Sequence, residues 1–175
     1  MIVIGYQGIG KSTICKRLGA VSGVIDLESS LFKNEVGFRC PDWHEVYCKI
    51  ALSLSEQGYT VFISSHKVIQ DYLKCFGKSV LVIYPSLDIH DDWINKLYAR
   101  YTSDKSRKNE AAWLGAMANF DKEIKALSES PFTKYEIKSM DYRLMDILNH
   151  ETEALLKCED KEKQQPTQEP ETSID

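Results

Sequence analysis

The sequence predicts an α/β protein of three layers, in which helices cover both faces of a parallel sheet of five strands. Short apolar runs alternate with longer amphipathic stretches, which is typical of strands joined by crossover helices. The first apolar run leads directly into a glycine-rich loop. With 175 residues, of which 43% are hydrophobic, the chain has enough apolar surface for one substantial core and a single domain.

Each short apolar run is predicted to be a strand, and the strands lie at residues 1–4, 24–27, 60–64, 79–84 and 134–138. The amphipathic stretches predict helices at residues 11–19, 41–57, 68–76, 89–102, 108–128 and 142–157. Gly58 and Gly77 follow helices where a left-handed cap is expected, and each precedes a strand. Pro41 and Asp42 suit the first turn of a helix.

The net charge of −4 arises at the end of the chain. Six of the 26 acidic residues and two of the 22 basic residues lie from Glu159 onward, which leaves 20 of each sign in residues 1–158. We expect a folded domain over residues 1–158 and a disordered acidic tail over residues 159–175, where apolar residues are too few to offset the entropy of ordering. The balanced charge of the domain argues against a dedicated nucleic-acid binder.

The rest of the composition predicts a cytoplasmic protein without a membrane partner. The N-terminal apolar run is four residues long, and no apolar segment approaches the ~18 residues that a membrane span needs. The five cysteines are odd in number and include no C-x-x-C pair, so we expect reduced thiols and neither a disulfide framework nor a zinc site. A homodimer is left open.

The most specific motif is G-x-x-x-x-G-K-[ST], which the segment from Gly5 onward matches completely. Its glycines allow a tight turn in which consecutive N–H groups converge on phosphates, and the following helix adds a favourable dipole. In this motif Lys11 reaches the β- and γ-phosphates of a nucleoside triphosphate, and the Ser12 hydroxyl ligates Mg²⁺. A glycine-rich turn without a ligand is the alternative. The residues expected to bind the cofactor are Gly5, Gly8, Ile9, Gly10, Lys11, Ser12 and Thr13.

Phosphate loops occur in GTPases, motor ATPases and small-molecule kinases, so other motifs must distinguish these classes. The chain has no N-K-x-D motif for base recognition, and the third predicted strand ends in Ser64-Ser65-His66 rather than in the acid of a Walker-B motif. The early phosphate loop, a body of about 160 residues and a late charged hairpin resemble the nucleoside and nucleotide kinase family. The resemblance covers roughly residues 1–157 and implies the P-loop NTPase fold with a helical lid. The short chain is similar to divergent deoxynucleoside monophosphate kinases of bacterial viruses.

The residues after the second predicted strand, 25–30, resemble the acidic stretch that faces the acceptor in this family. Phosphoryl transfer needs a carboxylate there, either to accept a proton from the acceptor or to hold Mg²⁺ through its water shell. Asp26 and Glu28 are two apart, so in a strand they face the same side. We expect Asp26 to act in catalysis and, with Ser12, in metal binding, and Glu28 to bind the acceptor. A helix cap is the alternative role.

A basic cluster late in the chain resembles the lid of these kinases, a mobile hairpin that closes over the phosphates, here at about residues 98–112. Arginine suits this role because its planar fork contacts two phosphate oxygens and its charge does not titrate. We expect Arg100 and Arg107 to act with Lys11 in catalysis, whereas a solvated basic helix end is the alternative. The members of the cluster are Lys96, Arg100, Lys105, Arg107 and Lys108.

The acceptor is expected between residues 28 and 50 and at the end of the third strand. Arg39 supplies a cation for a phosphate, and Trp43 supplies a ring on which a base can stack. Ser65 and His66 can hydrogen-bond a substrate at the place where nucleotide kinases carry an acceptor-loop signature that this chain lacks. Core packing for the ring, and capping of the next helix for Ser65 and His66, are the alternatives.

These expectations together describe an ATP- and Mg²⁺-dependent kinase whose small-molecule acceptor is a nucleoside or deoxynucleoside monophosphate. One alternative is a kinase for a non-nucleotide acceptor, such as a small hydroxy compound or a nucleic-acid end, which the Asp-x-Glu stretch suits equally well. The other is a nucleotide-binding regulatory protein without transfer chemistry. The missing Walker-B acid and the missing acceptor signature favour it.

Overall fold

The structure, a computed structural model, describes residues 1–19, 22–76 and 80–151. The chain divides into two compact units, Met1–Tyr142 and Arg143–Asp175. In the second unit residues 144–151 are helical, which agrees with the described part of the helix predicted over residues 142–157. The predicted cap at Gly77 and the predicted acidic tail lie outside the described residues. The candidate site lies in the first unit.

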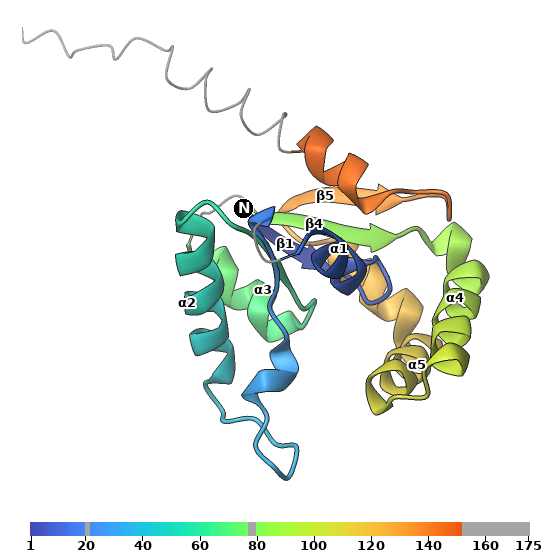
Figure 1. The fold of residues 1–175 in the computed structure, drawn as a ribbon, viewed down its shortest axis with the longest axis horizontal. Coiled ribbons are helices and arrows are strands. Elements are labelled where there is room, and N and C mark those ends of the chain that lie inside the picture. The colour runs from blue at the N-terminus through green and yellow to red at the C-terminus, as the bar shows by residue number, and fades with distance from the viewer. Residues whose placement is uncertain (20–21, 77–79, 152–175) are drawn as a thin grey trace, which may run out of the picture. The chain divides into compact units, whose positions relative to one another are not determined.

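The first unit is built on a five-stranded parallel sheet with the strand order β2-β3-β1-β4-β5 (Figure 1). β1 is the central strand and pairs in parallel with β3 on one side and β4 on the other, so that Ile4 lies opposite both Ile63 and Val82. The predicted five-stranded parallel sheet is confirmed. Its strands are β1 (Ile2–Gly5), β2 (Val24–Asp26), β3 (Thr60–Ile63), β4 (Val80–Pro85) and β5 (Thr133–Ile137).

The middle of the sheet forms the core. Every residue of β1 and β4 is buried, and so are the last three residues of β3. Strands that are buried on both faces need helices on both faces, which explains why these strands are continuous apolar runs rather than alternating ones. Each buried aliphatic side chain contributes roughly 1.5–3 kcal/mol to the driving force for folding.

Helices cover both faces of the sheet, and each predicted helix is present within a few residues. α2 begins at Trp43, so Pro41 and Asp42 precede the helix instead of forming its first turn, which corrects that prediction. Gly58 has a φ of +89°, the predicted left-handed conformation after α2. The helices are α1 (Lys11–Leu18), η2 (Ser29–Phe32), α2 (Trp43–Glu56), α3 (Lys67–Lys74), η3 (Leu87–Ile89), α4 (His90–Ser103) and α5 (Arg107–Ser128).

The helices pack in pairs around the strands. α2 contacts α3 and α4 contacts α5, and Figure 1 shows the two pairs on opposite flanks of the sheet. Because all strands are parallel, the loops that follow β1, β2, β3 and β4 emerge at one edge of the sheet. That edge carries the phosphate loop. Within the described part of the chain, no helix is long and apolar enough to cross a membrane.

The phosphate loop lies close to α4 at Gly8. This glycine has a φ of +88°, and a Cβ built on it would lie 2.9 Å from Leu97 Cδ2 and 3.2 Å from Trp93 Nε1. Two constraints therefore coincide at residue 8, since a left-handed φ disfavours any other residue and the space for a side chain is filled by α4.

We predict that Gly8→Ala lowers the free energy of unfolding by about 1–3 kcal/mol more than Gly37→Ala does. Gly37 is a matched control because its φ is also +88° but no atom lies within 4 Å of the position that a Cβ would occupy. The strain of φ is thus common to both variants, and only Gly8→Ala adds overpacking. Urea unfolding of the two variants measures the difference. If both variants lost the same free energy of unfolding, α4 would have to move away from residue 8 without an energetic cost. That result would contradict close packing at residue 8.

Candidate active site

The phosphate loop is anchored at its start and left-handed at two glycines. The N–H of Tyr6 donates to the carbonyl oxygen of Ile83 at 3.0 Å, which ties the loop to β4. Gly8 and Gly10 have φ values of +88° and +102°. α1 begins immediately afterwards with Gly10 at its N-cap and without a side-chain cap, so the N–H groups of its first turn remain available as donors to an anion.

Lys11 folds back on the loop. Its Nζ donates to the carbonyl oxygen of Gly5 at 2.6 Å and to that of Tyr6 at 3.3 Å. Burial lowers the pKa of Lys11 to about 8 because a charged ammonium loses hydration there. An anion bound at the start of α1 would favour the charged form of this side chain.

Four charged side chains act on the ammonium of Lys11. After the dominant effect of burial, Asp26 and Glu28 raise its pKa, and Lys108 and Arg100 lower it. The structure therefore brings three predicted site residues, Asp26, Glu28 and Arg100, into electrostatic reach of the phosphate loop. Arg107 is exposed at the start of α5 and is not among the groups that shift the pKa of Lys11.

Ser12 and Asp26, the two residues predicted to bind a metal, are hydrogen-bonded to each other. The Oγ of Ser12, in the first turn of α1, donates to Oδ2 of Asp26, the last residue of β2, at 2.7 Å. Mg²⁺ prefers hard oxygen ligands and binds through one or two carboxylates together with waters and substrate phosphates, and this pair fits that pattern. The described residues contain no group of three or more His, Cys, Asp or Glu that could hold a metal ion.

Glu28 contacts α5, in the region of the predicted lid. Its carboxylate forms an ion pair with Lys108, the second residue of α5. The pair links the end of β2 to the lid across 80 residues of sequence, and no local pattern predicts it. Because 61% of the Lys108 side chain is exposed, solvent screens the pair, and its contribution to stability is about 0–1 kcal/mol.

The predicted lid is a helical hairpin closed by its own hydrogen bonds. Asn109 Nδ2 donates to the carbonyl oxygen of Asp104 at 2.8 Å and to its Oδ2 at 2.9 Å. Ser106 Oγ caps α5 by accepting from the N–H of Asn109 at 3.4 Å. Farther along, the ring of Tyr98 on α4 packs against Trp113 on α5 with centroids 4.9 Å apart. These contacts hold the turn between the two helices.

Arg39 and Trp43, two residues that were predicted to bind the acceptor, come together. The guanidinium of Arg39 lies 4.4 Å from the centroid of the Trp43 ring. It is held by Ser29, to whose Oγ its Nη2 donates at 3.1 Å and to whose carbonyl oxygen its Nε donates at 3.3 Å. The rings of Phe32 and His66 flank Trp43 at centroid distances of 6.3 and 5.7 Å. The guanidinium of Arg39, the ring of Trp43 and the hydroxyl of Ser29 are therefore neighbours.

His66 and Ser65 lie at the end of β3, next to this group. The pKa of His66 is lowered by loss of hydration and then by the charges of Arg39 and Lys33, so its imidazole is neutral at neutral pH. Ser65 accepts a hydrogen bond from Gln70 Nε2 through its carbonyl oxygen at 3.0 Å. Ser64 Oγ is buried and has no hydrogen-bond partner among the described residues.

Three aromatic side chains near the phosphate loop hold backbone groups, and no sequence motif identifies them. The hydroxyl of the buried Tyr47 donates to the carbonyl oxygen of Leu27 at 2.6 Å and accepts from the N–H of Ser64 at 3.0 Å, which joins the ends of β2 and β3. Trp93 and Tyr142 donate to carbonyl oxygens of the phosphate loop from 86 and 134 residues away. A contact between such distant positions leaves no local signal in the sequence.

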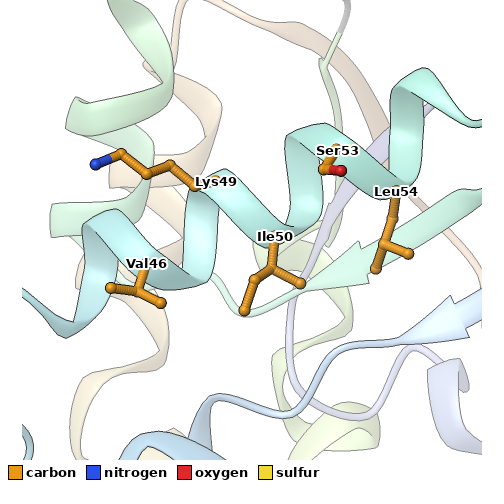
Figure 2. Close-up of a pocket in the computed structure, with 5 residues that line it drawn as sticks. All are labelled: Val46, Lys49, Ile50, Ser53 and Leu54. Carbon is orange, nitrogen blue, oxygen red and sulfur yellow. The ribbon is translucent and has the colours of Figure 1, made fainter.

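A hollow of about 340 Å³ lies along α2 (Figure 2). The side chains that line it all belong to this one helix, and none belongs to the phosphate loop. We therefore place the candidate site at the carboxyl edge of the sheet and not in this hollow. The lining residues are Val46, Lys49, Ile50, Ser53 and Leu54.

Titration of Lys11 should make stability depend on pH. Its folded pKa of about 8 lies below the ordinary lysine value of 10.5, so between these values the unfolded chain binds more protons and the folded state gains stability as pH rises. We predict that the free energy of unfolding of the wild type, relative to Lys11→Met, increases by about 1 kcal/mol from pH 7 to pH 9. Urea unfolding at several pH values measures this difference.

Lys16→Met is the control, because Lys16 is exposed on the same helix. Its free energy of unfolding should follow the pH dependence of the wild type. A constant difference between the wild type and Lys11→Met would mean that Lys11 is well hydrated, which would contradict its burial.

Comparisons with known proteins extend the description of the fold. No protein-family model matches the chain, and no curated protein matches it. A solved shikimate kinase from Bacteroides thetaiotaomicron is similar, with a TM-score of 0.50 and 14% sequence identity, over 89% of this chain and 96% of that chain. A gluconokinase from Sinorhizobium meliloti 1021 aligns with a TM-score of 0.48 and 12% identity, over 90% and 91% of the two chains. At 14% identity the similarity to the shikimate kinase concerns the fold alone, and the predicted three-layer α/β fold is confirmed.

Proposed function

We propose that this chain is a phosphotransferase that moves the γ-phosphoryl group of Mg-ATP to a nucleoside or deoxynucleoside monophosphate. The observation that carries the proposal is the hydrogen bond of Ser12 to Asp26 at the start of α1, beside Lys11, on whose charge both Asp26 and Arg100 act. The fold shared with a shikimate kinase supports phosphoryl transfer in general. The group around Arg39 supports a nucleotide as the acceptor.

The phosphate loop would hold ATP by its polyphosphate. The free N–H groups at the start of α1 would donate to phosphate oxygens, and Lys11 would exchange the carbonyl oxygens of Gly5 and Tyr6 for the phosphates. Ser12 and Asp26 are the residues that would hold Mg²⁺, which when bound neutralises charge on the β- and γ-phosphates.

Transfer would then depend on positioning and charge stabilisation. Arg100 lies within electrostatic reach of Lys11 and would stabilise the charge of the transferring group. A monophosphate attacks through an oxygen that is already ionised, so it needs no general base, whereas a hydroxyl acceptor must lose a proton. With a monophosphate acceptor, Asp26 would only hold the metal. With a hydroxyl acceptor, Asp26 would also be placed to accept the proton that the hydroxyl loses.

The acceptor group combines charge and a flat apolar face. Arg39 donates two of its five N–H bonds to Ser29, so the others can form a bidentate contact with a phosphate. Lys33 adds a second cation, and the faces of Trp43 and Phe32 are suited to a base. A nucleotide carries both an anionic group and an aromatic ring, which supports it as the acceptor class.

A kinase for a non-nucleotide acceptor is the second candidate. β3 ends in Ser64-Ser65-His66, which offers hydroxyl and imidazole groups where nucleotide kinases carry their acceptor signature. The buried and unpartnered Oγ of Ser64 is a polar atom that a hydroxylated ligand or a water could satisfy. The fold neighbour is also named for an acceptor that is not a nucleotide.

The proposal predicts ADP release from Mg-ATP that depends on a nucleoside monophosphate acceptor. The assay follows ADP with and without a panel of ribo- and deoxyribonucleoside monophosphates, and a second panel of small hydroxy acids and sugars. Lys11→Ala should reduce turnover by more than ~100-fold because it removes the cation nearest the phosphates. Lys16→Ala, an exposed lysine of the same helix, should leave turnover unchanged.

The outcomes separate the candidates. Stimulation only by the second panel would support the non-nucleotide kinase and contradict the nucleotide acceptor. ATP binding without stimulation by either panel would contradict phosphoryl transfer and favour a nucleotide-binding regulatory protein.

The two arginines should affect different kinetic constants. Arg100→Ala is expected to lower kcat by roughly 10²-fold with little change in the KM for ATP, because it would act on charge that develops during transfer. Arg39→Ala is expected to raise the KM for the acceptor by about 10-fold and to leave the KM for ATP unchanged. Steady-state kinetics with both substrates varied tests this division. An equal loss of ATP affinity in the two variants would contradict it.

A further inference from the structure

Trp93 holds one carbonyl group of the phosphate loop. It is fully buried on α4, and its Nε1 donates to the carbonyl oxygen of Gln7 at 3.0 Å. In a trans peptide the C=O of one residue and the N–H of the next point in opposite directions. The hydrogen bond from Trp93 therefore directs the N–H of Gly8 away from α4.

Tyr142 and Lys96 hold the next carbonyl group. The ammonium of Lys96 donates to the Tyr142 hydroxyl oxygen at 2.8 Å, and that hydroxyl donates to the carbonyl oxygen of Gly8 at 3.3 Å. The direction is fixed because an ammonium can only donate, which leaves the phenol proton for Gly8. In the same peptide unit, the N–H of Ile9 closes the turn onto the carbonyl oxygen of Tyr6 at 3.4 Å.

The three side chains form one packed unit. The rings of Trp93 and Tyr142 stack at a centroid distance of 5.9 Å and an interplanar angle of 18°. The Lys96 ammonium lies 4.4 Å from the first centroid and 4.7 Å from the second, so both rings stabilise its charge. A charged donor also strengthens the hydrogen bond that follows it in the chain.

We propose that Trp93, Lys96 and Tyr142 form a brace that holds the turn over residues 6–9 in the shape that receives the phosphates of a nucleotide. The inference rests on the proposed function of the phosphate loop and adds positioning residues to it. A phosphate-binding loop works by converging N–H groups, and these converge only if the carbonyl groups of the same peptides are held elsewhere. The brace does this for Gln7, and at Gly8 it fixes the peptide whose N–H, on Ile9, closes the turn.

The brace also joins the loop to the lid. Trp93 and Lys96 belong to α4, the helix that carries Arg100. The absence of a Cβ at Gly8 lets Trp93 and Leu97 approach the loop. The brace therefore packs the phosphate loop against the part of α4 that precedes the predicted lid.

Tyr142→Phe tests the brace with the smallest change. It keeps the ring on Trp93 and Lys96 and removes the hydroxyl, which donates to Gly8 and accepts from Lys96. We expect binding of Mg-tripolyphosphate and of Mg-ADP, measured by calorimetry, to weaken by about 3-fold or more, as for the loss of one hydrogen bond. Tripolyphosphate has no base, so its weaker binding reports on the loop alone. The thermal midpoint of the free protein should stay close to that of the wild type.

Tyr72→Phe is the matched control, a tyrosine on α3 whose ring packs on Phe76, and it should bind both probes as the wild type does. Trp93→Phe removes the other donor and should weaken tripolyphosphate binding in the same way if it folds, which circular dichroism checks. Wild-type affinity in Tyr142→Phe overturns the brace and leaves the proposed function intact. Failure of the wild type to bind either probe overturns both.

Discussion

The central position of β1 organises this protein. The strand is hydrogen-bonded on both sides, to β3 and β4, and is buried on both faces, so the point where it ends cannot shift relative to the rest of the sheet. The phosphate loop continues from that point and is tied once more to β4 by Tyr6. The start of α1 is therefore placed beside the ends of β2 and β3, where Asp26 and His66 lie. A candidate site assembled from the ends of β1, β2 and β3 needs this rigidity.

Electrostatics at this edge are balanced within the protein. Lys11 is placed where burial works against its charge, and the carboxylates of Asp26 and Glu28 offset part of that cost. Each of these carboxylates has a partner of its own, Asp26 in the Ser12 hydroxyl and Glu28 in Lys108 of the lid. A polyphosphate entering this region would replace internal partners with its own oxygens. Binding would then exchange one set of charge pairs for another rather than neutralise an isolated cation.

Three aromatic side chains use their hydrogen-bond donors to hold backbone groups of the loops near the candidate site. Tyr47 holds the carbonyl group of Leu27, and Trp93 and Tyr142 hold those of Gln7 and Gly8. In each case a large ring packs against neighbouring side chains while one donor reaches a backbone group in a loop at the carboxyl edge. The carbonyl and N–H groups of such loops have few backbone hydrogen-bond partners, because the hydrogen-bonded strands end where the loops begin. The rings therefore supply both the apolar contact and the hydrogen bond that regular secondary structure supplies elsewhere.

The sequence by itself determined the elements and the phosphate loop, because both depend on local patterns. Apolar runs and amphipathic stretches located all five strands and the helices between them, with an error of two residues at the start of α2, and the spacing of Gly5, Gly10 and Lys11 located the loop. The tertiary structure decided the strand order β2-β3-β1-β4-β5, the ion pair of Glu28 with Lys108, and the contacts of Trp93 and Tyr142 with the loop. These contacts join residues 80–134 positions apart, and a periodic pattern carries no information about which distant faces will meet. They exist because parallel strands bring their carboxyl ends to one edge, which is a property of the folded sheet and not of any segment within it.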